Sequence, residues 1–138
     1  MKPTSTIRKA PNVATIDVTV RALPPHGRAI TDGDGRALYA FSLDQANQSN
    51  CSKRCAEQFP PKLKTGIVNP GPRISSDRLN STVRQDGSRQ ITFFGRPLYY
   101  FVADKAKTRS FGQGVQSFGG TWHLVRPDGS LVQGSPQL

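Results

Sequence analysis

A ten-residue segment that occurs twice constrains the fold of this chain more than any other feature. Residues 35–44 (GRALYAFSLD) align without a gap with residues 95–104 (GRPLYYFVAD), at a constant offset of 60. Six of the ten positions are identical. Each copy opens on glycine and continues with the aromatic and aliphatic residues of a strand. The repetition predicts two related β-hairpins, which are too few for a solenoid and should share one core.

The segments in front of the copies are predicted to complete the hairpins. Residues 15–22 alternate β-branched and polar side chains and are typical of a strand. Residues 29–31 enter a DGDG turn, and residues 36–43 are expected to return as the paired strand. In the second half, residues 89–94 form a strand that turns at the glycine opening the second copy.

The remaining segments predict one short helix, one long loop and a final strand. Residues 49–59 contain both cysteines and are expected to form one or two helical turns before two prolines. Residues 64–82 are rich in Gly, Pro, Ser and Asn and predict a long loop, with room for a short strand or helical turn. Residues 121–125 form a strand, and residues 131–132 are expected to pair back after a turn.

The composition agrees with a single, small, mainly β domain. Thirteen glycines and eleven prolines among 138 residues favour short elements joined by many turns. No apolar run approaches the roughly 18 residues of a membrane span. The expected organisation is an extended arm at 1–15, one β-rich domain at 16–133 with repeat units at about 27–63 and 87–132, and a tail at 134–138.

The charge balance predicts attraction to acidic partners. Nineteen Lys and Arg against nine Asp and Glu give a net charge of +10 at pH 7. Such a surface attracts nucleic acid, anionic lipid, acidic polysaccharide or an acidic protein. The cations occur in short groups, without a polybasic run or a nucleic-acid-binding motif, which favours a solvated basic surface over a nucleic-acid site. The candidate contact residues are Lys53, Arg54, Lys105, Lys107 and Arg109.

Cys51 and Cys55 are the only cysteines, and we expect them to form a structural disulfide that pins the helical turn, with metal or redox roles as alternatives. Residues i and i+4 share one face of a helix, within reach of a disulfide in an oxidising compartment. In the cytosol the same pair would suggest a metal-binding or redox role. The spacing between the two cysteines is, however, one residue longer than in a redox or haem-attachment motif. A zinc site would need His26 and His123 as further ligands. The first residues contain no apolar stretch, so we expect a cytosolic protein or one whose export signal has been removed.

The repeated text resembles a family of secreted repeats and predicted lipoproteins defined by a Y-x-[FWY]-x-x-D motif. The motif occurs twice, and the resemblance spans about residues 28–129, including a C-x-x-x-C-A segment in which Phe59 stands where the family usually has Trp. It implies export from a bacterial cell, often with a lipid-modified cysteine at the mature start, which is not found near residue 1. It implies no particular biochemical activity. The motif residues are Tyr39, Phe41, Asp44, Tyr99, Phe101 and Asp104.

The motif residues are expected to be architectural. The aromatic side chains share one face in each strand and should form the common core, with a shallow aromatic ligand groove as the alternative. The two aspartates should accept hydrogen bonds at turns or caps, with Arg36 or Arg96 as partners, and a hydrolase role for them has no other support. Trp122 and His123 must face opposite sides of a strand. If Trp122 is buried, His123 points outward, as a surface residue or as a ligand for metal or haem.

Together these observations predict a non-enzymatic protein of the bacterial envelope, in the periplasm or outside the cell, with no cofactor. Its basic surface would hold an acidic partner, such as a membrane or redox protein complex or an envelope polyanion. The first alternative is a redox, metal-binding or haem-binding periplasmic protein that uses Cys51 and Cys55, or His123 with His26. The second alternative is a nucleic-acid binder.

Overall fold

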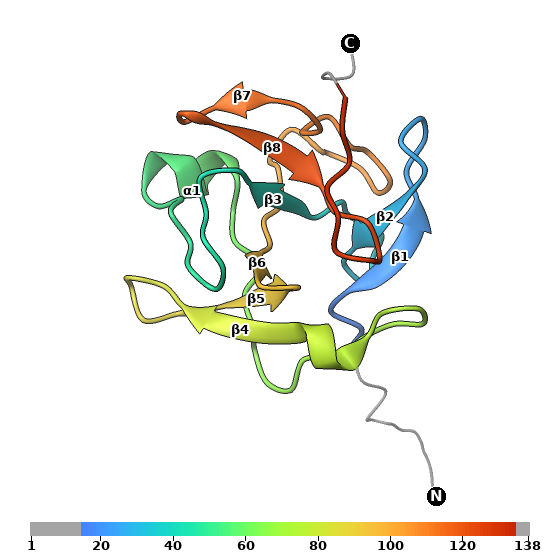
Figure 1. The fold of residues 1–138 in the computed structure, drawn as a ribbon, viewed down its shortest axis with the longest axis horizontal. Helices are drawn as coiled ribbons and strands as arrows, with labels where there is room; N and C mark the ends of the chain where they lie inside the picture. Colours follow the sequence, from blue (N-terminus) through green and yellow to red (C-terminus); the bar gives the residue numbers. More distant parts are fainter. Residues whose placement is uncertain (1–14, 135–138) are drawn as a thin grey trace, which may run out of the picture.

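The computed structural model describes residues 15–134, so only Thr15 of the predicted arm and only Gly134 of the predicted tail lie within it. The fold is mainly β, as predicted, with three small antiparallel sheets in this range: β1–β2, β3–β8–β7 and β4–β5–β6 (Figure 1). The elements are β1 Thr19–Ala22, β2 Arg28–Thr31, β3 Tyr39–Phe41, α1 Arg54–Gln58, a 3-10 turn Ser76–Arg78, β4 Leu79–Val83, β5 Arg89–Phe93, β6 Arg96–Pro97, β7 Gln116–Ser117 and β8 Gly120–Leu124.

Two hairpins, β1–β2 and β4–β5, are structural equivalents. Val20 lies opposite Ile30 in the first, and Ser81 lies opposite Ile91 in the second, so both positions are related by an offset of 61 residues. Residues 64–82 were expected to form a long loop with room for a short strand or helical turn, and the segment ends in both: the 3-10 turn Ser76–Arg78 and the start of β4 at Leu79. The strand has little hydrophobic patterning, because β4 is buried mainly at its first residue, continues with three polar residues and ends on the exposed Val83.

The strand predicted over residues 36–43 does not return along β2 for its whole length. It follows β2 only as far as Leu38, whose amide donates to the carbonyl of Ile30 (3.3 Å). β3 then leaves β2 and pairs with β8, which places Phe41 opposite Trp122 (Figure 1). All three residues of β3 are buried, so its backbone groups need partners on both edges. β8 supplies them on one edge and the second copy supplies them on the other.

The two copies of the repeated segment meet at Tyr39 and Tyr99. The amide of each residue donates to the carbonyl of the other, at 2.8 and 2.9 Å. Tyr99 is also bridged to Pro61, which follows the helical segment of the first half. The duplicated segments are thus paired with each other through the backbone, at the centre of the molecule.

The helix is shorter than predicted and contains only one of the cysteines. α1 begins at Arg54, so Cys51 precedes it and the two side chains do not share a helical face. Lys53, between them, has a φ of 55°, and this left-handed backbone prevents the helix from extending toward Cys51. The two Cα atoms are nevertheless 5.2 Å apart, and the cysteines form a disulfide.

The core consists of two hydrophobic clusters that both contain residues from each half of the chain. The first surrounds the disulfide and the motif aromatics and includes Tyr39, Phe41, Cys51, Cys55, Phe59, Tyr99 and Trp122. The second lies between β2 and β5 and includes Ile30, Leu38, Ile91, Phe93 and Leu98. Because neither cluster is built from one half alone, the halves are stabilised by packing against each other.

Candidate functional site

The tyrosine and aspartate of the duplicated motif bond across the copies. The hydroxyl of Tyr39 donates to the carboxylate of Asp104 (2.6 Å), and the hydroxyl of Tyr99 donates to that of Asp44 (2.7 Å). The second oxygen of each carboxylate accepts a backbone amide from the loop that follows, at 2.8 and 2.6 Å. Each motif tyrosine therefore depends on the aspartate of the other copy.

The arginines expected to pair with these aspartates bind backbone instead. Arg36 Nη1 donates to the carbonyl of Asp104 (2.9 Å), and Arg96 Nε donates to the carbonyl of Gly129 (2.9 Å). The expected ion pairs with the motif carboxylates do not form. The carboxylates are held by hydroxyl and amide donors.

Burial governs the protonation of the two Tyr–Asp pairs. It raises the pKa of Asp44 to about 6, against the opposing effect of the hydrogen bonds from Asn50 and Tyr99. It also raises the pKa of Asp104. Burial and then the neighbouring carboxylate raise the pKa of Tyr39 far above its usual range. The tyrosines are therefore permanent donors at neutral pH, and the carboxyl groups are the titrating members of the pairs.

Four stacked rings form a column that alternates between the two halves. Phe41 stacks on Trp122, Trp122 on Phe59 and Phe59 on Phe101, with centroid separations of 4.2, 3.6 and 4.6 Å. Phe59 and Trp122 form the centre of the column, with one motif phenylalanine at each end. The sequence motif did not single out Phe59, and the only signal for it was the Trp that similar sequences carry at its position.

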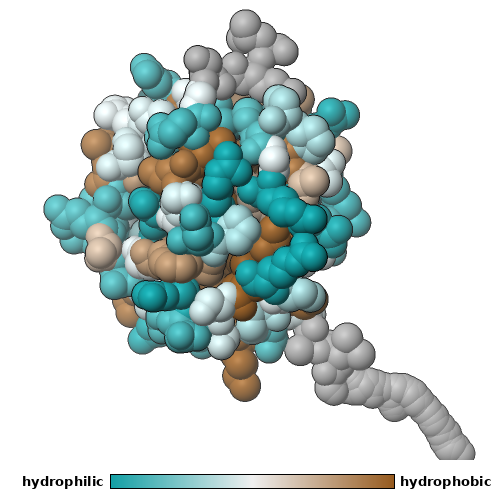
Figure 2. Space-filling view, turned by 45° about the vertical axis from the view of Figure 1, so that its right-hand side comes forward, coloured by the Kyte–Doolittle hydropathy of each residue, from teal (hydrophilic) through white to brown (hydrophobic). Residues whose placement is uncertain are grey.

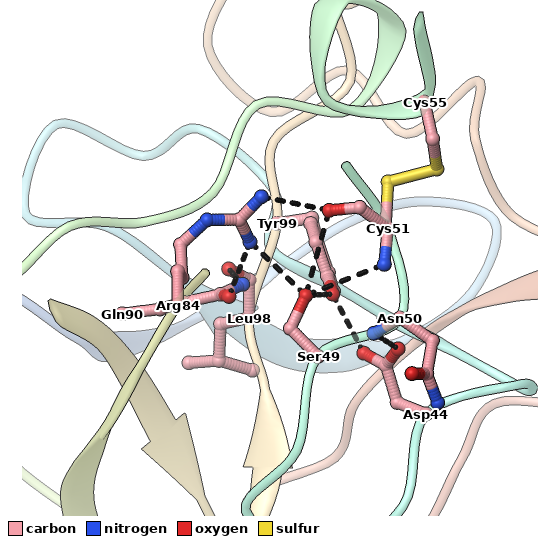
Figure 3. Close-up of a disulfide and its surroundings, with 9 residues drawn as sticks. All are labelled: Asp44, Ser49, Asn50, Cys51, Cys55, Arg84, Gln90, Leu98 and Tyr99. Carbon is pink, nitrogen blue, oxygen red and sulfur yellow. Dashed lines mark hydrogen bonds between the residues drawn. A yellow bond between two sulfur atoms is a disulfide. The ribbon is translucent and has the colours of Figure 1, made fainter. Parts of the chain in front are cut away.

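Arg84, which follows β4, ties the disulfide loop to β5 (Figure 3). Its Nη2 donates to the carbonyl of Cys51 (2.7 Å), and its Nη1 donates to Gln90 Oε1 (2.8 Å) and to Ser49 Oγ (3.0 Å). The Ser49 hydroxyl is in turn hydrogen-bonded to Tyr99. Sequence reasoning missed Arg84, because nothing distinguishes it there from an arginine that projects into solvent.

Two pockets occupy equivalent places at the two ends of the aromatic column. The Phe101 pocket, of about 360 Å³, is lined by Phe101 and Asp104 of the second copy and by Arg36 of the first. The Phe41 pocket, of about 230 Å³, has the reverse composition, with the phenylalanine and aspartate of the first copy and the arginine of the second. The identical positions of the repeated segment thus line pockets as well as forming the core.

The loop that contains Lys105 and Lys107 packs against the DGDG turn. The amide of Thr108 donates to the carbonyl of Gly35 (2.9 Å), and Arg21 Nη2 approaches the carbonyl of Gly33 at 3.4 Å. Arg36 lies at the end of the same turn and bonds to the start of the loop. These contacts gather four exposed cations from three segments, which we call the cationic turn: Arg21, Arg36, Lys105 and Lys107.

The other predicted contact residues are exposed at separate places. Lys53 and Arg54 lie at the start of α1, beside the disulfide. The guanidinium of Arg109 lies 6.0 Å from the centre of the Phe111 ring. The five predicted residues therefore do not form one site, and only Lys105 and Lys107 join the cationic turn.

The two histidines differ in their contacts, because the His123 ring bonds to the backbone and His26 Nε2 is buried without a hydrogen-bond partner. Trp122 is buried, and His123 on the other face of β8 is half-buried, with Nδ1 2.9 Å from the carbonyl oxygen of Val132. His26 is half-buried, and desolvation and nearby Arg126 lower its pKa. Within residues 15–134, no group of three or more His, Cys, Asp or Glu side chains is arranged to hold a metal ion.

Comparison with known proteins bears on the second half of the chain. No helix among residues 15–134 is long and apolar enough to cross a membrane. Neither a curated protein nor a solved structure matches the chain. The match to a known family covers β5, β6, the second copy of the motif and β8, and it indicates an exported protein. Residues 81–126 match the family model of a secreted repeat of unknown function.

Proposed function

We propose that this protein is a non-enzymatic binding or accessory protein of the bacterial envelope whose basic surface holds an acidic partner. The observation that carries the proposal is the internal use of its carboxylates. Residues 15–134 contain sixteen Lys and Arg against nine Asp and Glu. The only ion pair in this range joins Lys62 to Asp17, at 3.9 Å. Nearly all the described cations therefore lack a carboxylate partner within the molecule.

Seven of the nine acidic side chains accept hydrogen bonds from backbone amides or from neutral side chains. These seven are Asp17, Asp32, Asp44, Asp77, Asp86, Asp104 and Asp128. A carboxylate that is held by amides and hydroxyls stabilises a turn or a strand pair without neutralising a surface cation. The fold thus leaves an unbalanced positive surface, which raises the encounter rate with acidic partners.

The cationic turn is the part of this surface that we assign to the partner. Its four cations come from three segments that are fixed to one another by hydrogen bonds, so their arrangement is preorganised. Figure 2 shows a face of the molecule on which hydrophilic side chains lie around smaller hydrophobic areas.

The location we propose is the periplasm or the cell exterior. The disulfide suits an oxidising compartment. The match to a secreted repeat supports the same location. The redox and haem-binding alternatives have no comparable support, because Cys51 and Cys55 are 0% and 6% exposed and His123 is bonded to backbone.

Equilibrium binding to labelled poly-L-glutamate tests the proposal. Replacing three members of the cationic turn (Arg21→Gln, Lys105→Gln and Lys107→Gln) should weaken binding by about tenfold or more at low salt. The matched control removes the same charge from exposed arginines elsewhere: Arg73→Gln, Arg78→Gln and Arg89→Gln. The control should weaken binding much less. Equal losses in the two triple variants, or tighter binding of duplex DNA than of poly-L-glutamate at the same salt, would overturn the proposal.

A further inference from the structure

We propose that the Phe101 pocket receives an apolar side chain of the partner, with a carboxylate beside it held by Arg36. The recognised element is then an acidic protein segment that carries an exposed apolar residue. The inference rests on the proposed function, because it specifies how the acidic partner is held next to the cationic turn.

The floor of the pocket is apolar and packs against the aromatic column. Phe101 is the last ring of the aromatic column, with Phe59 stacked on one side and the edge of the Tyr39 ring against it at 6.3 Å between centroids. Pro60 and Val102 extend the apolar lining, and the Val102 side chain is 40% exposed. An aromatic or branched side chain placed here would bury surface against groups that do not have to rearrange.

Three charged side chains line the pocket, and only the guanidinium of Arg36 keeps donors that are free for a ligand. Asp104 accepts hydrogen bonds from a tyrosine and a backbone amide. Asp32 is also engaged, by the hydroxyl of Tyr100 (2.8 Å) and by two backbone amides. The exposed guanidinium of Arg36 donates one hydrogen bond, from Nη1 to a backbone carbonyl, and keeps other N–H groups for a ligand. Those groups match the geometry of a carboxylate.

The equivalent Phe41 pocket lacks these features and serves as an internal comparison. It is smaller, at about 230 Å³ against about 360 Å³. Its arginine, Arg96, is half-buried and bonded through Nε to Gly129. Its first-copy lining has Ala40 where the Phe101 pocket has Tyr100. The two pockets are lined by equivalent positions of the repeat, but only the Phe101 pocket is lined by a member of the cationic turn, Arg36.

The test uses two labelled acidic hexapeptides that differ only at one central position, Phe in the first and Ser in the second. Fluorescence anisotropy with the full chain should show about tenfold tighter binding of the Phe peptide, because a buried phenylalanine contributes at least that factor. Arg36→Gln should weaken binding of the Phe peptide by about tenfold, which is the loss expected for a charge-assisted hydrogen bond. Arg96→Gln removes the same charge from the Phe41 pocket and should change the affinity for the Phe peptide by less than about threefold.

A second pair of variants keeps the test decisive if Arg36→Gln alters the fold. Val102→Glu places a carboxylate at the rim of the Phe101 pocket and should abolish the preference for Phe over Ser. Val83→Glu, at an exposed position of β4, adds the same charge outside the pocket and should preserve that preference.

The outcomes separate this inference from the proposed function. Equal binding of the two peptides, or equal losses in Arg36→Gln and Arg96→Gln, would overturn the pocket assignment while leaving the acidic-partner proposal intact. If neither peptide nor poly-L-glutamate binds the unmodified protein, both proposals fail. Single-stranded DNA and the Ser peptide can each be tested as competitors of the bound Phe peptide. If the DNA competes more strongly, the pocket is assigned to base stacking and the inference is overturned.

Discussion

At the scale of single residues, the Tyr and Asp of the motif are explained by hydrogen bonds that join one copy to the other. Tyr39 and Tyr99 are both fully buried, and a buried hydroxyl needs a partner. The partner is the aspartate of the other copy in each case. Loss of either member would leave a polar group without its bond in the core, which costs about 1–3 kcal/mol. The sequence duplication indicated two related hairpins. It could not show that the tyrosine of each copy bonds to the aspartate of the other.

The raised carboxyl pKa values predict that the protein loses stability as the pH rises. The folded pKa of Asp44 is about 6, above its ordinary value of 3.8, so folding favours the protonated form. This contribution is fully present below about pH 3.8 and is lost as the pH rises through about 6. Asp104 acts in the same direction. Urea unfolding measured between pH 4 and 7 should give a shallower decline for Asp44→Asn than for the unmodified chain.

Asp86→Asn is the matched control for this pH experiment. Asp86 is exposed, and hydrogen bonds from Ser88 lower its pKa, so it titrates below the range in which Asp44 does. The control should therefore keep the pH dependence of the unmodified chain between pH 4 and 7. A decline as steep in Asp44→Asn as in the control would contradict the account of the buried pair.

At the scale of elements, the disulfide fixes a short loop that the helix does not stabilise. α1 has five residues, and an isolated helix of that length is unstable in water. The closed loop spans only four positions, so the chain-entropy model gives it about 2 kcal/mol. The double variant Cys51→Ala with Cys55→Ala should lose about that much free energy of unfolding in urea.

Reduction provides the control for the disulfide prediction. A reducing agent should destabilise the unmodified chain by a similar amount and should leave the double alanine variant unchanged. An unmodified chain that keeps its full stability after reduction would show that Arg84, through its bond to the Cys51 carbonyl, is sufficient to hold the loop.

The elements differ in how far their sequences predict them. The first hairpin turn was readable, because its DGDG sequence ends on Gly35, which has a φ of 94°. β8 was equally clear from its alternation around Trp122. β3 was predicted in the right place with the wrong partner, because a fully buried strand has no alternation that specifies which edge it joins. β4 was anticipated only as room for a short strand within a long loop, because four of its five residues lie outside the core.

At the scale of the whole molecule, the candidate site was only partly predictable. Lys105 and Lys107 were identified from their charge, but their neighbours Arg21 and Arg36 join them through a loop-to-turn contact that no sequence pattern encodes. Lys53 and Arg54 were identified by the same reasoning and lie elsewhere. Each pocket is lined by residues of both copies, so neither pocket could be predicted from one copy alone.

The most direct test of the central claim is photo-crosslinking in the envelope of the native host. A photoreactive amino acid at position 107 places the probe in the cationic turn, and one at Arg73 provides an exposed position outside it. The account predicts adducts with one or a few acidic envelope proteins from position 107, diminished by Arg36→Gln and largely missing from position 73. Equal adducts from the two positions, or adducts dominated by nucleic acid, would contradict it.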